Sequence, residues 1–193
     1  QAENLLMAAL LVISSGCKES EVFELLETIK PVRGRMELAA TRRNGASVYV
    51  DYAHTPEAIE VALKSLKPHI LGKLIVIIGA GGERDEGKRP LMGLAAEKNS
   101  DFVIITDDNP RNEDPQLIHH MIKNGIKDKN KVMVIGDRAE AILKAVDLLG
   151  VGDCLLIAGK GHETEQFIGE NIFPFDDFEQ ASLSVSSLDG IER

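Results

Sequence analysis

Short runs of β-branched and aliphatic residues recur along the chain and predict five strands: Ser47–Val50, Leu74–Ile78, Phe102–Thr106, Val132–Ile135 and Cys154–Ala158. The last four runs are almost continuously apolar, which is typical of strands covered on both faces. Between the runs, apolar residues recur at helical spacing, most clearly over 58–66 and 139–149. This alternation predicts an α/β fold in which helices flank a mostly parallel sheet and right-handed crossovers join the strands.

The predicted helices begin at residues that favour a helix start. Thr55 precedes Pro56, and Asp114 also precedes a proline, so a capping side chain stands ahead of a proline at the first helical position. Asp137, followed three residues later by Glu140, is a variant of the capping box. Ligands of open parallel sheets bind beyond the carboxyl ends of the strands, so the loops after the predicted strands are the first place to search for a site.

The N-terminal end of the chain departs from this pattern. Two helices are predicted over Ala2–Ser14 and Glu19–Ile29, and the first is apolar on nearly every side, so it needs partners on several faces. Pro31 marks a boundary. We therefore interpret residues 1–30 as the closing helices of a preceding domain and residues 31–193 as the next domain.

The C-terminal end departs from the pattern as well. Gln166–Gly169 and Ile172–Phe175 flank two turn-forming residues and predict a β-hairpin. A last helix is predicted over Asp176–Leu188. Neither a repeat nor a low-complexity tract is present.

Composition and charge limit the classes of function. The 193 residues are 44% hydrophobic and 27% charged, which is typical of a globular protein and excludes a disordered chain. The net charge of −9 makes nucleic acid and anionic membranes unsuitable partners, because both require a basic face. Cys17 and Cys154 have no neighbours at metal-ligand or redox-motif spacing, so we expect a reducing, cytoplasmic setting.

The beginning of the chain lacks the features of a targeting segment. Its longest apolar run, Leu5–Ile13, has nine residues, whereas a bilayer span needs about 20. No basic residue precedes this run, and the chain starts at Gln1 without an initiating Met. We therefore expect residue 1 to be a cut point inside a longer polypeptide.

A glycine-rich loop, Gly79–Arg89, follows one predicted strand and precedes a helix, as a phosphate-binding loop does. Gly82–Lys88 has the spacing G-x-x-x-x-G-K, but Arg89 stands where a hydroxyl should bind magnesium, and three carboxylates would meet the phosphates. The dinucleotide fingerprint fails too, because Arg84 replaces its third small residue. The interpretations that remain are a solvated charged loop and a turn in which Arg84 grips a carboxylate.

Two further loops offer charges to a ligand. Asp108, Asn109 and Arg111 follow one predicted strand and supply an anion, an amide and a planar cation. The segment Gly159–Glu163 follows the last parallel strand, and its Glu163 carboxylate could receive an ammonium group. Taken singly, each segment has an ordinary interpretation as a turn, and His162 as a structural or exposed histidine.

A fourth loop carries Asp51 and His54 at the end of the first predicted strand. These side chains could hold ribose hydroxyls or a phosphate, or merely cap the helix that follows. All four loops come after strands of one parallel sheet, so they open on the same edge. Their shared position is what predicts a site.

Read in order, these segments resemble the Mur ligase family, whose members join an amino acid to the peptide of the peptidoglycan precursor at the expense of ATP. The resemblance covers the whole chain and is strongest to the branch that adds meso-diaminopimelate. It implies a Rossmann-like C-terminal domain and a part in cell-wall biogenesis, cell shape and cell division. The segments that carry it are Gly34–Glu37, Val50–Pro56, Gly81–Asp85, Gly87–Gly93, Asp108–Arg111 and Gly159–Glu163.

The resemblance also implies roles for individual residues. Arg35, Asp51 and His54 match the contribution of this domain to the ATP site. The positions that match the diaminopimelate site are Arg84, Asp108, Asn109, Pro110, Arg111, Gly159 and Glu163. Glu83 and Glu165 depart from the family pattern, and we expect the first to shift Arg84 slightly and the second to alter the packing after Glu163.

Arg111 favours diaminopimelate over lysine as the substrate. Diaminopimelate has a second amino acid head at the end that does not react, whereas lysine has only a methylene where that head carries its carboxylate. An arginine left unpaired in the site would be costly to bury, and lysine-adding relatives generally lack it. A site built to pair this group should reject lysine.

The family's ATP loop, its carbamylated lysine and its magnesium ligands lie in the central domain, and these 193 residues contain no G-x-x-G-K-[ST] segment. We therefore expect neither a catalytic residue nor a metal site in this chain. ATP and Mg²⁺ would be held mainly by the rest of the polypeptide, which would also bind the UDP-N-acetylmuramoyl dipeptide. The rival hypotheses are a lysine-adding or folate-polyglutamate ligase domain and a free-standing, non-catalytic binding module.

Overall fold

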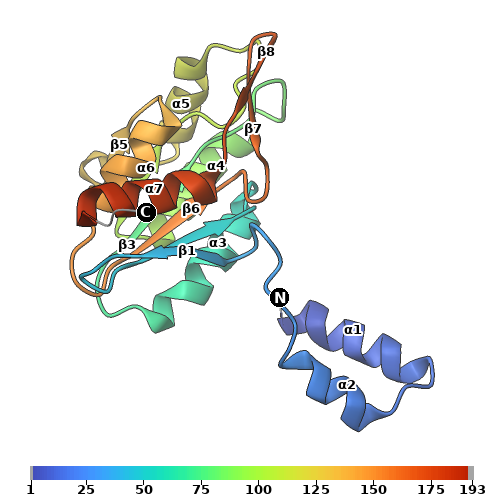
Figure 1. The fold of residues 1–193 in the computed structure, drawn as a ribbon. Helices are drawn as coiled ribbons and strands as arrows, with labels where there is room; N and C mark the ends of the chain where they lie inside the picture. The colour runs from blue at the N-terminus through green and yellow to red at the C-terminus, as the bar shows by residue number, and fades with distance from the viewer. Residues whose placement is uncertain (1, 191–193) are drawn as a thin grey trace. The chain divides into compact units, whose positions relative to one another are not determined.

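Figure 1 shows the computed structural model of the chain, which describes residues 2–190 and divides into two compact units after Val32. The first unit holds helices α1 (Ala2–Ser14) and α2 (Glu19–Leu26). The prediction of α2 through residue 29 was wrong at its C-terminal end. Residues 28 and 29 bond to carbonyls three residues back, which tightens the chain into turns ahead of the proline at position 31.

The apolar residues of the first unit are largely exposed. Leu11 is 67% exposed, and Leu6, Met7 and Leu25 are more than half exposed. Within residues 2–190, no helix combines the length and the apolar character that crossing a bilayer requires.

The second unit is built on a mostly parallel sheet. Among the described residues the sheet has six strands in the order β1-β2-β6-β3-β4-β5, and only β1 runs antiparallel. The strands are β1 (Glu37–Thr41), β2 (Ser47–Asp51), β3 (Leu74–Ile78), β4 (Phe102–Ile105), β5 (Val132–Val134) and β6 (Cys154–Ala158). The five predicted strands are confirmed, with ends shifted by at most one residue.

Strand β1 was not predicted. Its sequence, Glu-Leu-Ala-Ala-Thr, has one β-branched residue and two alanines, so it lacks the composition typical of a strand. The strand forms because it pairs along β2 at the edge of the sheet. Tertiary pairing here outweighs local preference.

Helices cover both faces of this sheet (Figure 1). Helices α3 (Pro56–Leu66), α4 (Lys88–Asn99) and α5 (Pro115–Asn124) pack on one face, and α6 (Arg138–Asp147) and α7 (Asp177–Asp189) pack on the other. Two 3₁₀ turns, Lys67–His69 and Lys129–Lys131, precede β3 and β5. Two hydrophobic cores result, one on each side of the sheet, and the central strands β3 and β6 are buried throughout.

The predicted helix starts are confirmed by their hydrogen bonds. The side chain of Thr55 accepts from the N–H of Ala58, that of Asp114 from Gln116, and that of Asp137 from Glu140. These caps satisfy N–H groups that have no partner inside the helix. They fix where the loops at the carboxyl edge end.

The predicted hairpin is present and protrudes beside the sheet. Its strands are β7 (Glu165–Ile168) and β8 (Asn171–Pro174), each beginning one residue earlier than predicted. Gly169 takes a φ of +58° in the turn, a conformation that glycine adopts without strain. The last helix, α7, starts after Asp176, whose carboxylate accepts from the N–H of Phe178.

The order of the strands identifies where a ligand should bind. The chain passes from β2 through β3 and β4 to β5 by helices on one face, and α6 on the other face returns it to β6, between β2 and β3. The loop after β3 therefore leads to a helix on one face of the sheet, whereas the chain after its neighbour β6 continues to α7 on the other face. In open α/β sheets, the crevice outside the carboxyl ends of such strands is the usual ligand site.

Truncating a central core residue should destabilise the second unit. Ile77 in β3 is fully buried, so Ile77→Ala should lower the free energy of unfolding by about 2–5 kcal/mol through lost burial and a residual cavity. Val61 on α3 is 68% exposed, and Val61→Ala should change it by less than about 0.5 kcal/mol. Urea unfolding followed by circular dichroism measures both, and equal effects would contradict the assigned core.

Candidate functional site

A pocket of about 250 Å³ lies at the carboxyl edge of the sheet, between the loops that follow β2, β3, β4 and β6. Its charged lining has both signs: Arg84, Lys88 and Arg111 are cationic, and Asp108 and Glu163 are carboxylates. A ligand that itself carries both charges would be complementary to such a lining.

Most of the predicted site residues are brought together in this pocket. Of the seven predicted to bind the amino acid, all except Pro110 line the pocket, and Pro110 is buried in the loop after β4. Of the three predicted to bind ATP, His54 lines the pocket, whereas Arg35 and Asp51 lie outside its lining.

Arg111 is held by its backbone and by its side chain. Its N–H donates to the carbonyl of Phe167 at 3.0 Å, and its carbonyl accepts from the N–H of Gly169 at 2.7 Å. These bonds hold it at a φ of +52°, which is uncommon for a residue with a Cβ. Nη1 also donates to the carbonyl of Gly82 at 2.9 Å. The guanidinium is thus anchored on one side while it lines the pocket, which suits it to a bidentate grip on a carboxylate.

Two glycines make room for the charged groups of the pocket. A Cβ at Gly81 would lie 2.9 Å from Nη1 of Arg111, and a Cβ at Gly159 would lie 2.6 Å from Oδ2 of Asp108. Gly159 also has a φ of +117°. A side chain at either position would displace one of these two charged groups, and the positive φ at residue 159 also favours glycine there.

The loop that carries Arg84 is fixed against the loop after β4. The N–H of Gly82 donates to the carbonyl of Asn109 at 2.9 Å. Arg89, which is fully buried, pairs with Glu113 at 2.9 Å, and the hydrogen bond from Arg89 holds the pKa of Glu113 below its ordinary value. Arg84 itself is exposed and has one long contact, Nη1 to its neighbour's carbonyl at 3.4 Å. Its guanidinium is therefore available to a ligand.

The two positions that depart from the family pattern make different contacts. Glu83 adopts a φ of +56°, and its carboxylate accepts from Nδ2 of Asn112 at 2.8 Å, which adds a bond between the two loops. Glu165 is exposed and contributes its backbone carbonyl, which accepts from Nζ of Lys160 at 2.6 Å. That bond does not depend on the type of side chain at position 165.

Asn109 and Glu163 are tied to each other and to a buried lysine. Nδ2 of Asn109 donates to Oε2 of Glu163 at 3.0 Å, and Oδ1 of Asn109 accepts from the N–H of Phe167 at 3.0 Å. Nζ of Lys160 donates to both side chains, at 3.2 Å to Asn109 and 3.3 Å to Glu163. Asn109 is therefore engaged mainly by the protein, whereas Glu163 remains partly exposed in the pocket.

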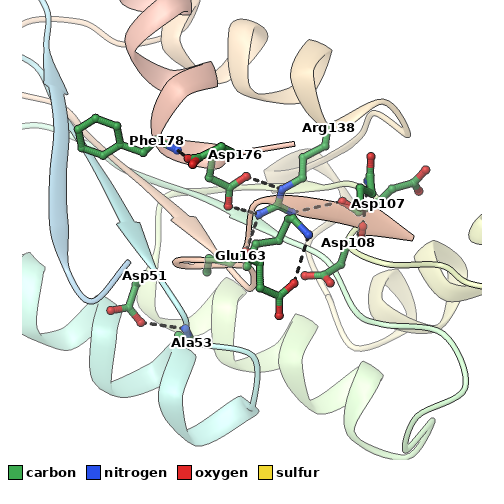
Figure 2. A network of polar contacts seen from close by, with 12 residues as sticks. Asp51, Ala53, Asp107, Asp108, Arg138, Glu163, Asp176 and Phe178 are labelled. Carbon is green, nitrogen blue, oxygen red and sulfur yellow. Dashed lines mark hydrogen bonds and ion pairs between the residues drawn. The ribbon is translucent and has the colours of Figure 1, made fainter. Parts of the chain in front are cut away.

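A buried ion pair lies close to the acidic residues of the pocket, and Figure 2 shows its arginine, Arg138, beside Asp108 and Glu163. Arg138 and Asp177 are both fully buried and joined by two hydrogen bonds of 2.7 Å. Nη2 of Arg138 also donates to the carbonyl of Ala158 at 3.0 Å, and Nη1 donates to that of Asp107 at 3.3 Å. The pair therefore fixes the last residue of β6 and the loop after β4, at the residues directly before Gly159 and Asp108.

The Asp108 carboxylate is desolvated in the pocket. Burial raises the pKa of its carboxyl above the ordinary value of 3.8, and nearby Glu163 and Asp177 act in the same direction. Arg138 and Lys160 act in the opposite direction without cancelling the effect of burial. A bound ammonium group would favour the ionised form of Asp108.

The residues predicted to bind ATP form a second group beside the pocket. The Asp51 carboxylate accepts from the N–H of Met36 at 2.7 Å and of Ala53 at 2.8 Å, so it holds two backbone segments together. Arg35 lies over the ring of Tyr52, 4.7 Å from its centre. Nδ1 of His54 is 2.8 Å from the carbonyl of Tyr52, and since a carbonyl oxygen can only accept, Nδ1 is the donor in this contact.

Several residues of the site were missed by the sequence reasoning. Lys160 stood in a quoted segment, but nothing in its spacing indicated a buried ammonium. Arg138 and Asp177 belong to separate helices, and no motif joins them. Tyr52 and Lys88 line the pocket and also stood in quoted segments. Across residues 2–190, no cluster of three or more histidine, cysteine or acidic side chains is suited to hold a metal ion.

The chain matches a known family and known relatives. Residues 34–161 match the model of the Mur ligase glutamate ligase domain. The chain is 48% identical over 187 residues to the UDP-N-acetylmuramoyl-L-alanyl-D-glutamate--2,6-diaminopimelate ligase of Bradyrhizobium diazoefficiens, and 51% identical over 191 residues to that of Rickettsia typhi. Each alignment covers 97% of this chain and 38% of the relative.

The fold matches as well. A solved structure of a UDP-N-acetylmuramoyl-L-alanyl-D-glutamate--2,6-diaminopimelate ligase superposes with a TM-score of 0.77 and 37% identity, over 97% of this chain and 38% of that one. The chain thus spans little more than a third of the length of these relatives. Since the family model covers the strands and loops that build the pocket, from Gly34 to Gly161, this chain belongs to the Mur ligase family.

Proposed function

We propose that this chain is the amino-acid-binding, C-terminal domain of an ATP-dependent ligase that adds meso-diaminopimelate to UDP-N-acetylmuramoyl-L-alanyl-D-glutamate in peptidoglycan synthesis. The two diaminopimelate ligases compared above align with almost the whole chain. The observation that carries the proposal is the pocket in which Arg111 and two carboxylates share one lining. The non-reacting head of diaminopimelate carries one carboxylate and one ammonium, which such a lining would pair.

The proposed work of this domain is positioning. Arg111 and Arg84 would hold the carboxylate of the distal head, and Asp108 and Glu163 would hold its ammonium. With that head fixed, the amine at the other end of the substrate is aimed at an activated carboxyl group on the neighbouring domain. Bringing two free reactants together in the right orientation costs entropy, which is a large part of the barrier in such reactions. Binding the amine beside its target removes that cost from the chemical step.

The remainder of the ligase would supply the nucleotide chemistry. Bound ATP would provide the phosphoryl group that activates the carboxyl, and Arg35, Asp51 and His54 would contribute the edge of its site from this domain. Each Asp51 oxygen already accepts one backbone N–H and has a second lone pair for a ribose hydroxyl. We propose residues 1–30, with their exposed apolar side chains, as the closing helices of the central domain, and the cytoplasm as the location.

The chain alone should not hydrolyse ATP. It contains no G-x-x-G-K-[ST] segment, and the related Gly82–Lys88 loop has carboxylates where phosphates would lie. Phosphate release by the purified 193-residue chain, with ATP, Mg²⁺, the UDP-linked dipeptide and diaminopimelate, should equal the blank. Release that depends on diaminopimelate would contradict this expectation.

Removing the Arg111 guanidinium should disable the use of diaminopimelate. In the complete ligase that contains this chain, Arg111→Ala should raise the KM for diaminopimelate roughly 30-fold or more, because a desolvated carboxylate would lose its partner. Arg43 is exposed and its side chain makes no hydrogen bond to any of residues 2–190, so Arg43→Ala is the matched control.

The phosphate released during ligation, measured once with diaminopimelate and once with lysine, decides which of the two is the substrate. Wild-type enzyme should accept diaminopimelate and reject lysine. If the enzyme prefers lysine and Arg111→Ala leaves that activity unchanged, the lysine-adding alternative is correct.

Asp108 should lower the stability of the fold at neutral pH. An acid whose pKa is raised on folding destabilises the native state once it is ionised, and this penalty disappears as the pH falls from the raised pKa through 3.8. Asp108→Asn should therefore raise the melting temperature at pH 7, and the gain should shrink toward pH 4. Asp147→Asn, at an exposed surface pair, is the control. A lower melting temperature for Asp108→Asn at pH 7 would contradict the assignment.

A further inference from the structure

Lys160 is a fully buried lysine directly behind the pocket. Its ammonium has three hydrogen-bond acceptors: Oδ1 of Asn109 at 3.2 Å, Oε2 of Glu163 at 3.3 Å and the carbonyl of Glu165 at 2.6 Å. All three donors of the group are thus used inside the protein. Lys160 does not line the pocket, so it would act on a ligand only through other residues.

The backbone around Lys160 directs its side chain inward. Gly159 and Gly161, on either side of it, have φ values of +117° and +56°. A Cβ at Gly161 would lie 2.7 Å from the Cβ of Tyr52 and 2.8 Å from the carbonyl of Gly34. The two glycines let the loop after β6 fold tightly against its neighbours, with the lysine between them facing the interior.

Lys160 sets the orientation of the Asn109 amide. The amide oxygen receives two donors, Nζ of Lys160 and the N–H of Phe167, so its nitrogen must point the other way. That nitrogen donates to Oε2 of Glu163 at 3.0 Å. The same carboxylate oxygen therefore receives one bond from Lys160 directly and one through the amide that Lys160 orients.

Charge also requires a cation at this position. Glu163 and Asp108 both line the pocket, and the nearby Glu163 carboxylate raises the cost of ionising Asp108. Arg138 is already committed to Asp177 by two hydrogen bonds. Arg138 and Lys160 both favour the ionised form of Asp108, and Lys160 also pairs with Glu163 at 3.3 Å, so the lysine helps two carboxylates to stand together in the pocket.

We propose that Lys160 is the positioning residue for ammonium recognition in this pocket: it aims the Glu163 carboxylate, directly and through Asn109, at the ammonium of the bound amino acid head. The inference rests on the proposed function, since it concerns the same pocket. Removing the Lys160 ammonium should therefore weaken binding of the ligand's ammonium group only. Recognition of the carboxylate, which belongs to Arg111, should not change.

The test compares two ligands in the complete ligase. Lys160→Met keeps a side chain of similar length without charge or donors, and it should raise the KM for diaminopimelate about tenfold or more, with the KM for ATP unchanged. Pimelate, which has the two carboxylates but no ammonium, should inhibit wild type and variant with constants within about twofold. Lys144→Met, at an exposed lysine on α6, is the control and should change neither.

A double-mutant cycle distinguishes positioning from a purely structural role. If Lys160 acts through Glu163, Lys160→Met should have less than about a twofold further effect in a Glu163→Gln background. If Lys160→Met fails to fold, the same comparison in the two backgrounds can be made with Lys160→Gln, which keeps a hydrogen-bond donor for Asn109. Equal effects in both backgrounds, or parallel loss of pimelate binding, would overturn the inference. Failure of the wild-type enzyme to use diaminopimelate would instead overturn the proposed function, and this inference with it.

Discussion

The buried ion pair between Arg138 and Asp177 is where the fold and the candidate site meet. It joins α6 to α7 on one face of the sheet, and the same guanidinium binds the carbonyl of the last residue of β6 and that of Asp107 in the loop after β4. A buried pair of this kind adds little net stability, because desolvating both ions offsets their attraction. Its clearer effect is geometric. It fixes the two positions from which the acidic half of the pocket follows.

Around that fixed point, the loops constrain one another. Among the described residues, the non-glycine positions with positive φ are Met36, Glu83 and Arg111, and the last two lie in the loops that form the pocket. Such conformations persist only where the surroundings hold them. For Arg111 the surroundings are the hairpin, in which Phe167 of β7 and Gly169 of the turn form its two backbone hydrogen bonds. The hairpin therefore helps to place a guanidinium that comes from a different loop.

The sequence predicted the parts of the molecule that depend on local chemistry. Buried strands were recognised from apolar runs, and helix starts from Thr55, Asp114 and Asp137, because capping requires only neighbouring residues. Strand β1 was missed, since an alanine-rich edge strand forms through its partner and not through its own preference. The segments that carry the pocket residues were found because each follows a strand, and parallel strands end at one edge of the sheet.

What the sequence determined by itself is the alternation of strand and helix, the loops at the carboxyl edge and the charged residues in them. Only the tertiary structure decided which of those residues line the pocket and which hold the others in place. Asn109 and Glu163 are both polar loop residues in the sequence, yet one is engaged mainly by the protein and the other faces the pocket. Lys160 is likewise a loop lysine in the sequence, and only the folded structure shows that its ammonium is buried. Burial and long-range hydrogen bonding depend on how distant segments pack, and no local pattern encodes them.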